Sequence, residues 1–447
     1  MQFNLRANKY KPRLKTESTI FGSYISFIIL GAFLLSLPIS SASHTYTNLL
    51  TCFFTATSAM CVTGLVVVDT ATNWSFFGQT VILILIQLGG MSIILVSASI
   101  AMFIGKKIGF SQRATLKDAL SLEKVGGIMK FTKFILKGFL IFELLGAILL
   151  FPIFKKDFGM LKSIWLSIFH SISAFCNAGF DLMGTREKFS SLDFYKSNLA
   201  LNIIIMVLIV VGGIGFNVWR DIVKKKNNIR KYSLQTKIVL LTTSILIALP
   251  ALYFYLFEFN FLQGTNRILA SLFQSITTRT AGFNTMDFAK MSEVGKAISI
   301  ILMLIGGSPG STAGGMKTTT FAVLIIATIA IFRQENEAHI FDRRIEIQTV
   351  KNAITIFMLY LCLFITAGFT ICKIENIPLI DSMFETESAI GTVGLTLGHI
   401  PHLSVASRIM IIMMMFLGRV GGLTFIYAIV PKLDNTKGYI SENITIG

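Results

Sequence analysis

Charged side chains are scarce in this sequence, and acidic ones are the scarcest. Only 14% of the 447 residues are Asp, Glu, Lys or Arg, whereas soluble domains carry roughly 25%. Hydrophobic residues make up 53%, and several apolar runs reach about 20 residues, the length of a helix that crosses a bilayer. A soluble chain of this size could not cover its surface with so few charges. The sequence therefore predicts an all-α polytopic membrane protein.

Sequence motifs for catalysis and metal binding are also missing. There is no HExxH, no GxSxG and no cluster of His and acidic residues at ligand spacing, so an enzyme is not expected. The five cysteines lie in or beside apolar segments without paired spacing, which indicates small buried residues rather than disulfides or a zinc site: Cys52, Cys61, Cys176, Cys362 and Cys372. The basic N-terminus precedes an apolar run at 18–39 that is too long for a signal peptide, which predicts a retained first span.

The net charge of +17 results from 40 basic and 23 acidic residues. Such an excess is compatible with nucleic-acid binding, but the positions of the charges argue against it. Of the 40 Lys and Arg residues, 26 lie in presumed inner segments and 11 in presumed outer ones, while Arg279, Lys317 and Arg419 lie within the apolar bundle. This asymmetry follows the positive-inside rule. It predicts a multi-pass protein with both termini in the cytoplasm, in contact with membrane lipids and not with nucleic acid.

Four short breaks interrupt the apolar sequence at regular intervals. Aligned on Gly64, Gly179, Gly282 and Gly394, the breaks lie 115, 103 and 112 residues apart. A long apolar run and a shorter one precede each break, and a second long run follows it. Runs of 10–14 apolar residues are candidate re-entrant segments, and a fixed period indicates internal repeats. We therefore expect four span–P-loop–span repeats, with eight transmembrane helices and four re-entrant pore loops around one pseudo-fourfold pore.

The expected boundaries follow from these runs. The first spans are 19–40, 134–153, 238–257 and 353–371. The re-entrant helices are 47–59, 163–175, 267–278 and 380–390. The second spans are 76–104, 198–219, 297–332 and 404–431, and they share the motifs QLGGM (87–91), VGGIG (211–215), IGGSP (305–309) and LGRVG (417–421). The whole chain then divides into a cytoplasmic segment 1–18, repeats at 19–104, 105–219, 220–332 and 333–431, and a C-terminal tail 432–447.

The breaks predict an ion selectivity filter made of backbone carbonyls. Each unpaired backbone group in a bilayer costs several kcal/mol, and it is tolerated only where it is buried in protein or lines water. Around one axis, four sets of carbonyls can replace the hydration shell of a cation, and glycine adopts the backbone angles this requires. Their small uncharged flanks favour a monovalent cation. The expected filter residues are Val62, Thr63, Gly64, Asn177, Ala178, Gly179, Thr280, Ala281, Gly282, Thr392, Val393 and Gly394.

The sequence TVGL at 392–395 resembles the TVGYG filter strand of potassium channels. Four unequal span–P-loop–span units in one chain resemble the Trk/Ktr/HKT superfamily of potassium transporters over essentially the whole chain, and most of all its bacterial KtrB branch. The resemblance implies the membrane subunit of a bacterial potassium uptake system, with K+ bound at Gly64, Gly179, Gly282 and Gly394 and no organic cofactor in this chain. It leaves open whether Na+ activates uptake, and whether flux is channel-like or coupled.

The resemblance also implies partners. Ktr membrane subunits form a homodimer, with the C-terminal tail at its interface. A KtrA-like cytoplasmic ring of nucleotide-binding subunits regulates them. The basic inner loops 106–133 and 220–237 are candidate docking surfaces for such a ring, or contacts for lipid headgroups.

The second span of repeat 3 departs from the others. Residues 306–320 read GGSPGSTAGGMKTTT, and five glycines with Pro309 cannot continue a helix, so the span divides into 297–305 and 318–332. The resemblance implies an intramembrane gate made of Gly306, Gly307, Ser308, Pro309, Gly310, Ser311, Thr312, Ala313, Gly314, Gly315 and Lys317, with Arg419 beside it under the filter. The residues alone leave a plain flexible kink open. A phosphate-binding loop is disfavoured because Met316 interrupts the Walker pattern. For Arg419, a structural salt bridge is the alternative, because an intramembrane Arg usually has a partner or a cavity.

Several acidic residues carry weaker signals. Asp69, Asp181 and Asp287 lie shortly after their filter glycines. They could give the outer mouth of the pore a negative potential, or they could be ordinary loop acids. Glu385 and Glu387 are expected at the head of the fourth re-entrant helix, where negative charge is favourable.

Two other function classes remain open. A coupled secondary transporter should carry paired intramembrane acids, but Glu143 is the only such acid that the sequence suggests, and its partner is not evident. A membrane-embedded enzyme should carry clustered polar catalysts, and none is found.

Overall fold

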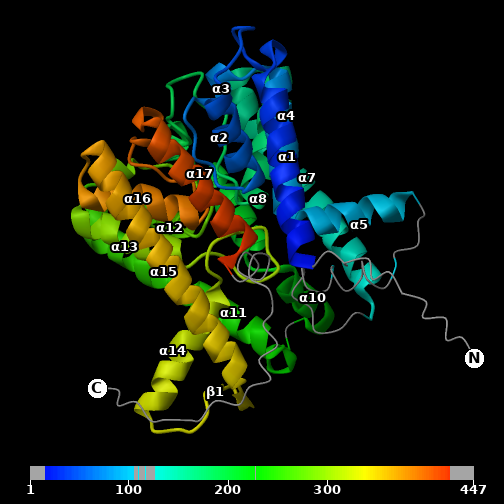
Figure 1. Ribbon diagram of the computed structural model, residues 1–447, viewed down its shortest axis with the longest axis vertical. Coiled ribbons are helices and arrows are strands. Elements are labelled where there is room, and N and C mark those ends of the chain that lie inside the picture. The colour runs from blue at the N-terminus through cyan, green and yellow to red at the C-terminus, as the bar shows by residue number, and fades with distance from the viewer. Residues whose placement is uncertain (1–15, 105–108, 110–115, 117–125, 227, 423–447) are drawn as a thin grey trace, which may run out of the picture.

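The computed structural model describes residues 16–104, 109, 116, 126–226 and 228–422 (Figure 1). Within these residues the chain is predominantly helical, as expected, and its only sheet is a small hairpin of β1 (His339–Ile340) and β2 (Arg343–Arg344). The segment 1–15, most of residues 106–125 in the expected inner loop 106–133, residues 423–431 of the last expected span, and the tail 432–447 lie outside the described residues. The roles expected of them stay predictions.

Each repeat begins with a first helix and a short helix. The first helices are α1 (Thr16–Ser36), α7 (Ile128–Phe158), α11 (Leu234–Tyr253) and α15 (Ile347–Glu375). The short helices are α2 (Leu49–Met60), α8 (Met160–Phe175), α12 (Gly264–Thr277) and α16 (Leu379–Ile390). Each short helix packs against the first helix of its own repeat. A break glycine follows each short helix within five residues of its end.

The second helix is interrupted in more than one repeat. The segments are α4 (Phe76–Met91) and α5 (Ile93–Phe103), α9 (Leu199–Gly213) and α10 (Phe216–Lys225), α13 (Glu293–Leu304) and α14 (Thr318–Phe332), and α17 (Val405–Val420). A positive φ angle at Ser92 (66°) follows the end of α4, and another at Gly215 (96°) precedes the start of α10. The helices α9 and α10 meet at 97°. The expectation of continuous second spans at 76–104 and 198–219 is therefore wrong.

The glycine motif of the second helices explains why they can lie so close to the short helices. A methyl group on Gly89, Gly212 or Gly418 would collide with the carbonyl oxygen of Met60, Phe175 or Ile390 respectively. Each of those carbonyls lies four residues before the break glycine of the same repeat. The motif thus brings each of these three second helices against the end of its own short helix, just before the helix bends or ends.

The repeats close into a ring through contacts between neighbours. The second helix of each repeat packs against the short helix of the next: α4 on α8, α9 on α12, α13 on α16, and α17 back on α2 (Figure 1). One continuous hydrophobic core includes a fully buried phenylalanine from each short helix: Phe54, Phe169, Phe273 and Phe384. Burying a side chain of this size contributes about 1.5–3 kcal/mol, so the four short helices are anchored alike.

Three described helices are long and apolar enough to cross a membrane: α7, α11 with its continuation η4 (Phe254–Glu258), and α15. The bent pair of α9 and α10 makes a fourth if it counts as one span. α7 exposes a row of large apolar side chains, among them Leu140, Leu144 and Ile148, and such a surface suits contact with lipid. The full count of eight spans stays a prediction.

The remaining elements are short connections. They are α3 (Thr70–Asn73), η1 (Pro38–Ser40), η2 (Asp193–Tyr195), η3 (Ile229–Lys231), η5 (Phe288–Lys290) and η6 (Ile400–His402). Of the five cysteines, Cys52, Cys61 and Cys176 are buried as expected, whereas Cys362 is exposed on α15.

Candidate ion pathway

The four breaks share one backbone conformation. Two residues before each glycine, φ is positive: 56° at Val62, 58° at Asn177, 62° at Thr280 and 50° at Thr392. The glycines follow with φ of 93°, 68°, 78° and 96°, and the residue between the two has no positive φ. Positive φ is a genuine outlier for β-branched residues such as valine and threonine. The same strain in four places indicates a backbone shape that the fold enforces.

Hydrogen bonds to the short helix hold this shape in three of the repeats. The N–H groups of Thr63, Ala178 and Val393 each donate at 2.8 Å to the carbonyl oxygen five residues earlier. In repeat 3 the bond is shorter in sequence, from Ala281 to Thr277 at 3.0 Å. The N–H groups therefore turn back toward the short helix. The carbonyl groups of the break are left available on its other side.

The breaks meet in a closed ring. A methyl group on Gly179 would lie 2.8 Å from the carbonyl oxygen of Ala281, in the next repeat. Methyl groups on Gly64, Gly282 and Gly394 would collide in the same way with the carbonyl oxygens of Ala178, Val393 and Thr63. The contacts run from repeat 1 through repeat 4 and back to repeat 1. The structure thus brings together, in chain order, all four segments that the sequence marked as filter candidates.

In repeats 2, 3 and 4 a side chain of the short helix ties the break to the loop that follows it. Nine residues before its break glycine, His170 accepts the N–H of Leu182 at 3.3 Å through Nε2, and Glu385 accepts the N–H of Leu397 at 2.9 Å. Gln274 donates to the carbonyl of Met286 at 2.8 Å in repeat 3. The sequence analysis missed His170 and Gln274. His170 and Glu385 both lie nine residues before their break glycines, so the alignment of the repeats was a signal for His170, whereas Gln274 lies eight residues before Gly282.

The placement expected for Glu385 and Glu387 is wrong. α16 begins at Leu379, directly after Pro378, so Asp381 occupies its first turn and both glutamates lie in its second half, fully buried. The expected bounds of 380–390 agree with α16 to within one residue, so the error lies in the position given to the two glutamates within the helix. Glu385 supports the loop that follows the fourth break, as described above, and does not compensate the charge of the helix start.

The three candidate mouth acids accept hydrogen bonds in the loops that follow the first three breaks. Asp69 accepts the N–H of Thr72 at 2.9 Å and, from the neighbouring repeat, the N–H of Phe189 at 3.0 Å. Asp181 and Asp287 each accept an N–H two residues further along the chain. These contacts are those of loop acids, and Asp69 in addition joins repeats 1 and 2.

The glycine-rich loop at 306–317 connects α13 and α14, and its two ends lie side by side. Its ends are joined where Gly306 donates to Met316 at 2.7 Å and Thr318 donates to Gly307 at 3.0 Å. Its middle lies against the bend of α9, because Ser308 donates to Gly213 at 2.9 Å. The loop crosses the centre of the molecule in Figure 1.

The same loop contacts the breaks directly. The Thr312 hydroxyl lies 2.9 Å from the Oδ1 atom of Asn177 in the second break. On the opposite side, a methyl group on Gly315 would lie 2.8 Å from the carbonyl oxygen of Gly391, which precedes the fourth break. The loop therefore spans the ring from repeat 2 to repeat 4.

Arg419, from repeat 4, joins the glycine-rich loop to repeat 1. Its guanidinium donates to the carbonyl of Thr312 at 2.5 Å and to that of Gly89, at the end of α4, at 2.5 Å. In the described part of the chain these hydrogen bonds go to carbonyl oxygens and not to an acid, which disfavours the salt-bridge alternative. Lys317 donates within the loop, to the carbonyl of Ala313 at 2.8 Å.

Glu143, whose partner the sequence did not reveal, is paired in the structure. Both carboxylate oxygens accept from Nε2 of Gln87, at 3.0 and 3.1 Å. The Ser171 hydroxyl donates to the Glu143 backbone carbonyl at 2.6 Å. This cluster joins α7, α4 and α8 behind the second break. Gln87 and Ser171 lie 56 and 28 residues from Glu143 in the sequence, so no local pattern could reveal them as its partners.

The Glu143 cluster leads to a stability prediction. Glu143→Leu is expected to lower the melting temperature of the purified protein in detergent, because the Gln87 amide loses a partner and such a loss costs about 1–3 kcal/mol. Glu143→Gln, which can still accept from Gln87, should stay near the native value. Equal melting temperatures for the Leu variant and the native protein would show that the cluster does not stabilise the fold.

Comparisons with known proteins match the chain over nearly its full length. The family described as "TrkH: Cation transport protein" matches residues 1–437. The potassium/sodium uptake protein NtpJ of Enterococcus hirae is 38% identical, over 98% of this chain and 99% of that protein. The Ktr system potassium uptake protein B of Bacillus subtilis is 38% identical, over 94% of both chains. The crystal structure of the potassium transporter TrkH from Vibrio parahaemolyticus superposes with a TM-score of 0.74 at 18% identity, covering 95% of this chain and 87% of that one.

Proposed function

Because this chain belongs to the TrkH family of cation transport proteins, we propose that it is the ion-translocating subunit of a bacterial potassium uptake system. In this proposal K+ crosses the membrane through the ring of four breaks, which acts as the selectivity filter. The bundle comprises eight spans and four pore loops, in a multi-pass arrangement with both termini in the cytoplasm.

The closed ring of glycine contacts is the single observation that carries the proposal. It places the backbone of four segments around one axis, in chain order, with N–H groups turned away. Rings of backbone carbonyls replace the hydration shell of a potassium ion in selectivity filters. Carboxylate rings, which would favour divalent ions, do not occur among the twelve candidate residues. Glycine at all four positions supports potassium as the preferred ion.

The loop at 306–317 is proposed as the gate under this filter. Its contacts with the second break, with the residue before the fourth break, and through Arg419 with α4, support a role in blocking the pathway. Lys317 stabilises the loop through Ala313. Movement of the loop would open the path without any change in the filter.

A cytoplasmic partner is proposed to move the gate. Two relatives of this chain are named Ktr system potassium uptake protein B, which supports a system with more than one component. We propose that this chain forms a homodimer and works with a regulatory, KtrA-like ring of nucleotide-binding subunits. The basic inner surface around α10, with Arg220, Lys224 and Lys225, is the proposed docking region. The NtpJ relative is named for potassium and sodium, so Na+ is proposed as an activator of uptake to be tested beside K+.

The proposal predicts that this chain restores growth of a potassium-requiring bacterial strain at low K+, when produced with its regulatory partner. Initial rates of K+ uptake should saturate with K+ and exceed those of Na+ uptake, since the filter favours the less hydrated ion. An empty vector and the regulatory partner alone serve as controls. Failure to restore growth with verified membrane insertion of both subunits would contradict the proposal.

A further inference from the structure

The third break carries a charge that the other three lack. Arg279 lies three residues before Gly282, where the aligned positions hold Cys61, Cys176 and Gly391. It lies two residues after the last residue of α12, and only 8% of its surface is exposed. A buried guanidinium next to a pathway for cations needs compensation, because an unpaired buried charge is strongly destabilising.

No acid compensates Arg279 among the residues that the structure describes. Its Nε atom is buried without a hydrogen-bond partner. The carbonyl end of α12 offers a partial negative charge of about one half, which leaves the rest unbalanced. Arg419, by contrast, donates to two carbonyl oxygens. Of the two arginines near the breaks, Arg419 is hydrogen-bonded to carbonyl oxygens, whereas the Nε atom of Arg279 is buried and unpaired.

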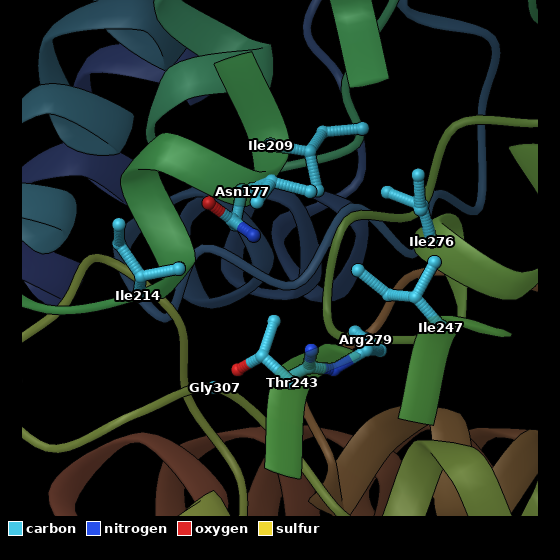
Figure 2. Close-up of a pocket in the computed structure, with 10 residues that line it drawn as sticks. Asn177, Ile209, Ile214, Thr243, Ile247, Ile276, Arg279 and Gly307 are labelled. Atoms are coloured by element: carbon cyan, nitrogen blue, oxygen red, sulfur yellow. The ribbon is translucent and has the colours of Figure 1, made fainter. Parts of the chain in front are cut away.

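The guanidinium of Arg279 borders a small pocket between repeats 2 and 3. Figure 2 shows Ile209 of α9 and Ile214, the residue after that helix, on one side and Thr243 and Ile247 of α11 on the other. The filter candidate Asn177 and Gly307 of the glycine-rich loop also line this pocket.

A second polar group in the pocket is also unpaired. The Thr243 hydroxyl, on a residue that is 6% exposed, has no hydrogen-bond partner within the described chain. The remaining walls are mostly isoleucine and valine side chains. A cation and a hydroxyl donor in an apolar surrounding complement a small anion, and low polarity strengthens the attraction.

We propose that this pocket binds a small monovalent anion of the size of chloride between Arg279 and Thr243. The inference rests on the proposed function, and it adds a regulator to it. Arg279 directly precedes the third filter segment, which begins at Thr280. At this short distance its uncompensated positive charge repels a cation in the filter. A bound anion neutralises that charge and raises the occupancy of the filter by K+. Because Gly307 lines the same pocket, the state of the loop affects whether the anion can bind.

Two measurements on the purified full-length protein test the site. Crystals or vitrified samples prepared in bromide should show a bromide peak beside Arg279, by anomalous scattering in the crystal case. Proteoliposomes should take up rubidium severalfold faster in chloride or bromide than in gluconate, which is too large for the pocket. Arg279→Gln should remove both the bromide peak and the dependence on the anion. Lys290→Gln, at an exposed basic residue of the same repeat, is the matched control and should retain both.

A second variant covers the case in which Arg279→Gln fails to fold. Thr243→Val keeps the charge and the shape and removes only the hydroxyl, so it should shift the anion dependence to higher bromide concentrations. No bromide peak at Arg279 in the native protein, or equal rubidium uptake in chloride and gluconate, would overturn the anion site. Rubidium uptake that is absent in every anion would contradict the proposed function itself, so the two failures are distinguishable.

Discussion

Gly179→Ala is expected to remove nearly all potassium uptake while the protein still reaches the membrane. The added methyl group would lie 2.8 Å from both the Ala281 carbonyl oxygen and the Gly282 Cα, closer than a Cβ atom tolerates, so the ring must open on that side. The φ of 68° adds strain, since the left-handed conformation costs about 1–2 kcal/mol for a residue with a Cβ. A distortion worth 1.4 kcal/mol already changes an occupancy about tenfold.

Cys176→Ser is the matched control for Gly179→Ala. Cys176 lies in the same break, fully buried, and its thiol approaches Gln87 Oε1 at 3.6 Å. Serine is slightly smaller and can donate to the same amide, so uptake should remain within about threefold of native, a change below 1 kcal/mol. Initial rates of rubidium uptake, normalised to membrane protein, compare the two. If Gly179→Ala transports as well as Cys176→Ser, the second break does not contribute to the filter.

Much of this architecture could be predicted because the same sequence pattern repeats four times along the chain. The four glycines, with short apolar runs before them and long ones after, specify four equivalent units, and the helical membrane fold follows from the length of those runs. The family resemblance, based on TVGL at 392–395 and the repeated units, is confirmed by the family match over residues 1–437. A pattern found at the same position in all four repeats rarely arises by chance, and this made the prediction of the repeats reliable.

What the sequence did not reveal depends on contacts between repeats. Gln87 and Glu143 meet across 56 residues, and Arg419 reaches Gly89 across 330. No local pattern specifies such pairs. The bend of α9 was missed for a related reason: VGGIG is compatible with a straight helix, and only the loop from repeat 3 reveals why Gly215 is needed. A methyl group there would lie 2.7 Å from the carbonyl oxygen of Pro309.

Arg419→Ala is expected to raise basal rubidium flux, measured in proteoliposomes without any regulatory partner. The substitution removes both hydrogen bonds that tie the loop at Thr312 to α17 and α4, and bonds from a charged donor contribute about 1.5–3 kcal/mol each. Loss of one such bond shifts the loop toward its open state by about tenfold or more. Arg408→Gln is the control, because Arg408 lies on the same helix and donates at 2.9 Å to Pro401, away from the loop.

Arg419→Lys separates the two ways in which Arg419 can close the pathway. Lysine keeps the positive charge, but a single ammonium cannot reproduce the planar fork that donates to two separate carbonyls. If the tether to Thr312 and Gly89 holds the gate, the Lys variant should leak almost as much as the Ala variant. If the charge alone repels cations, the Lys variant should stay as closed as the native protein. A basal flux in Arg419→Ala no higher than in Arg408→Gln would exclude both roles.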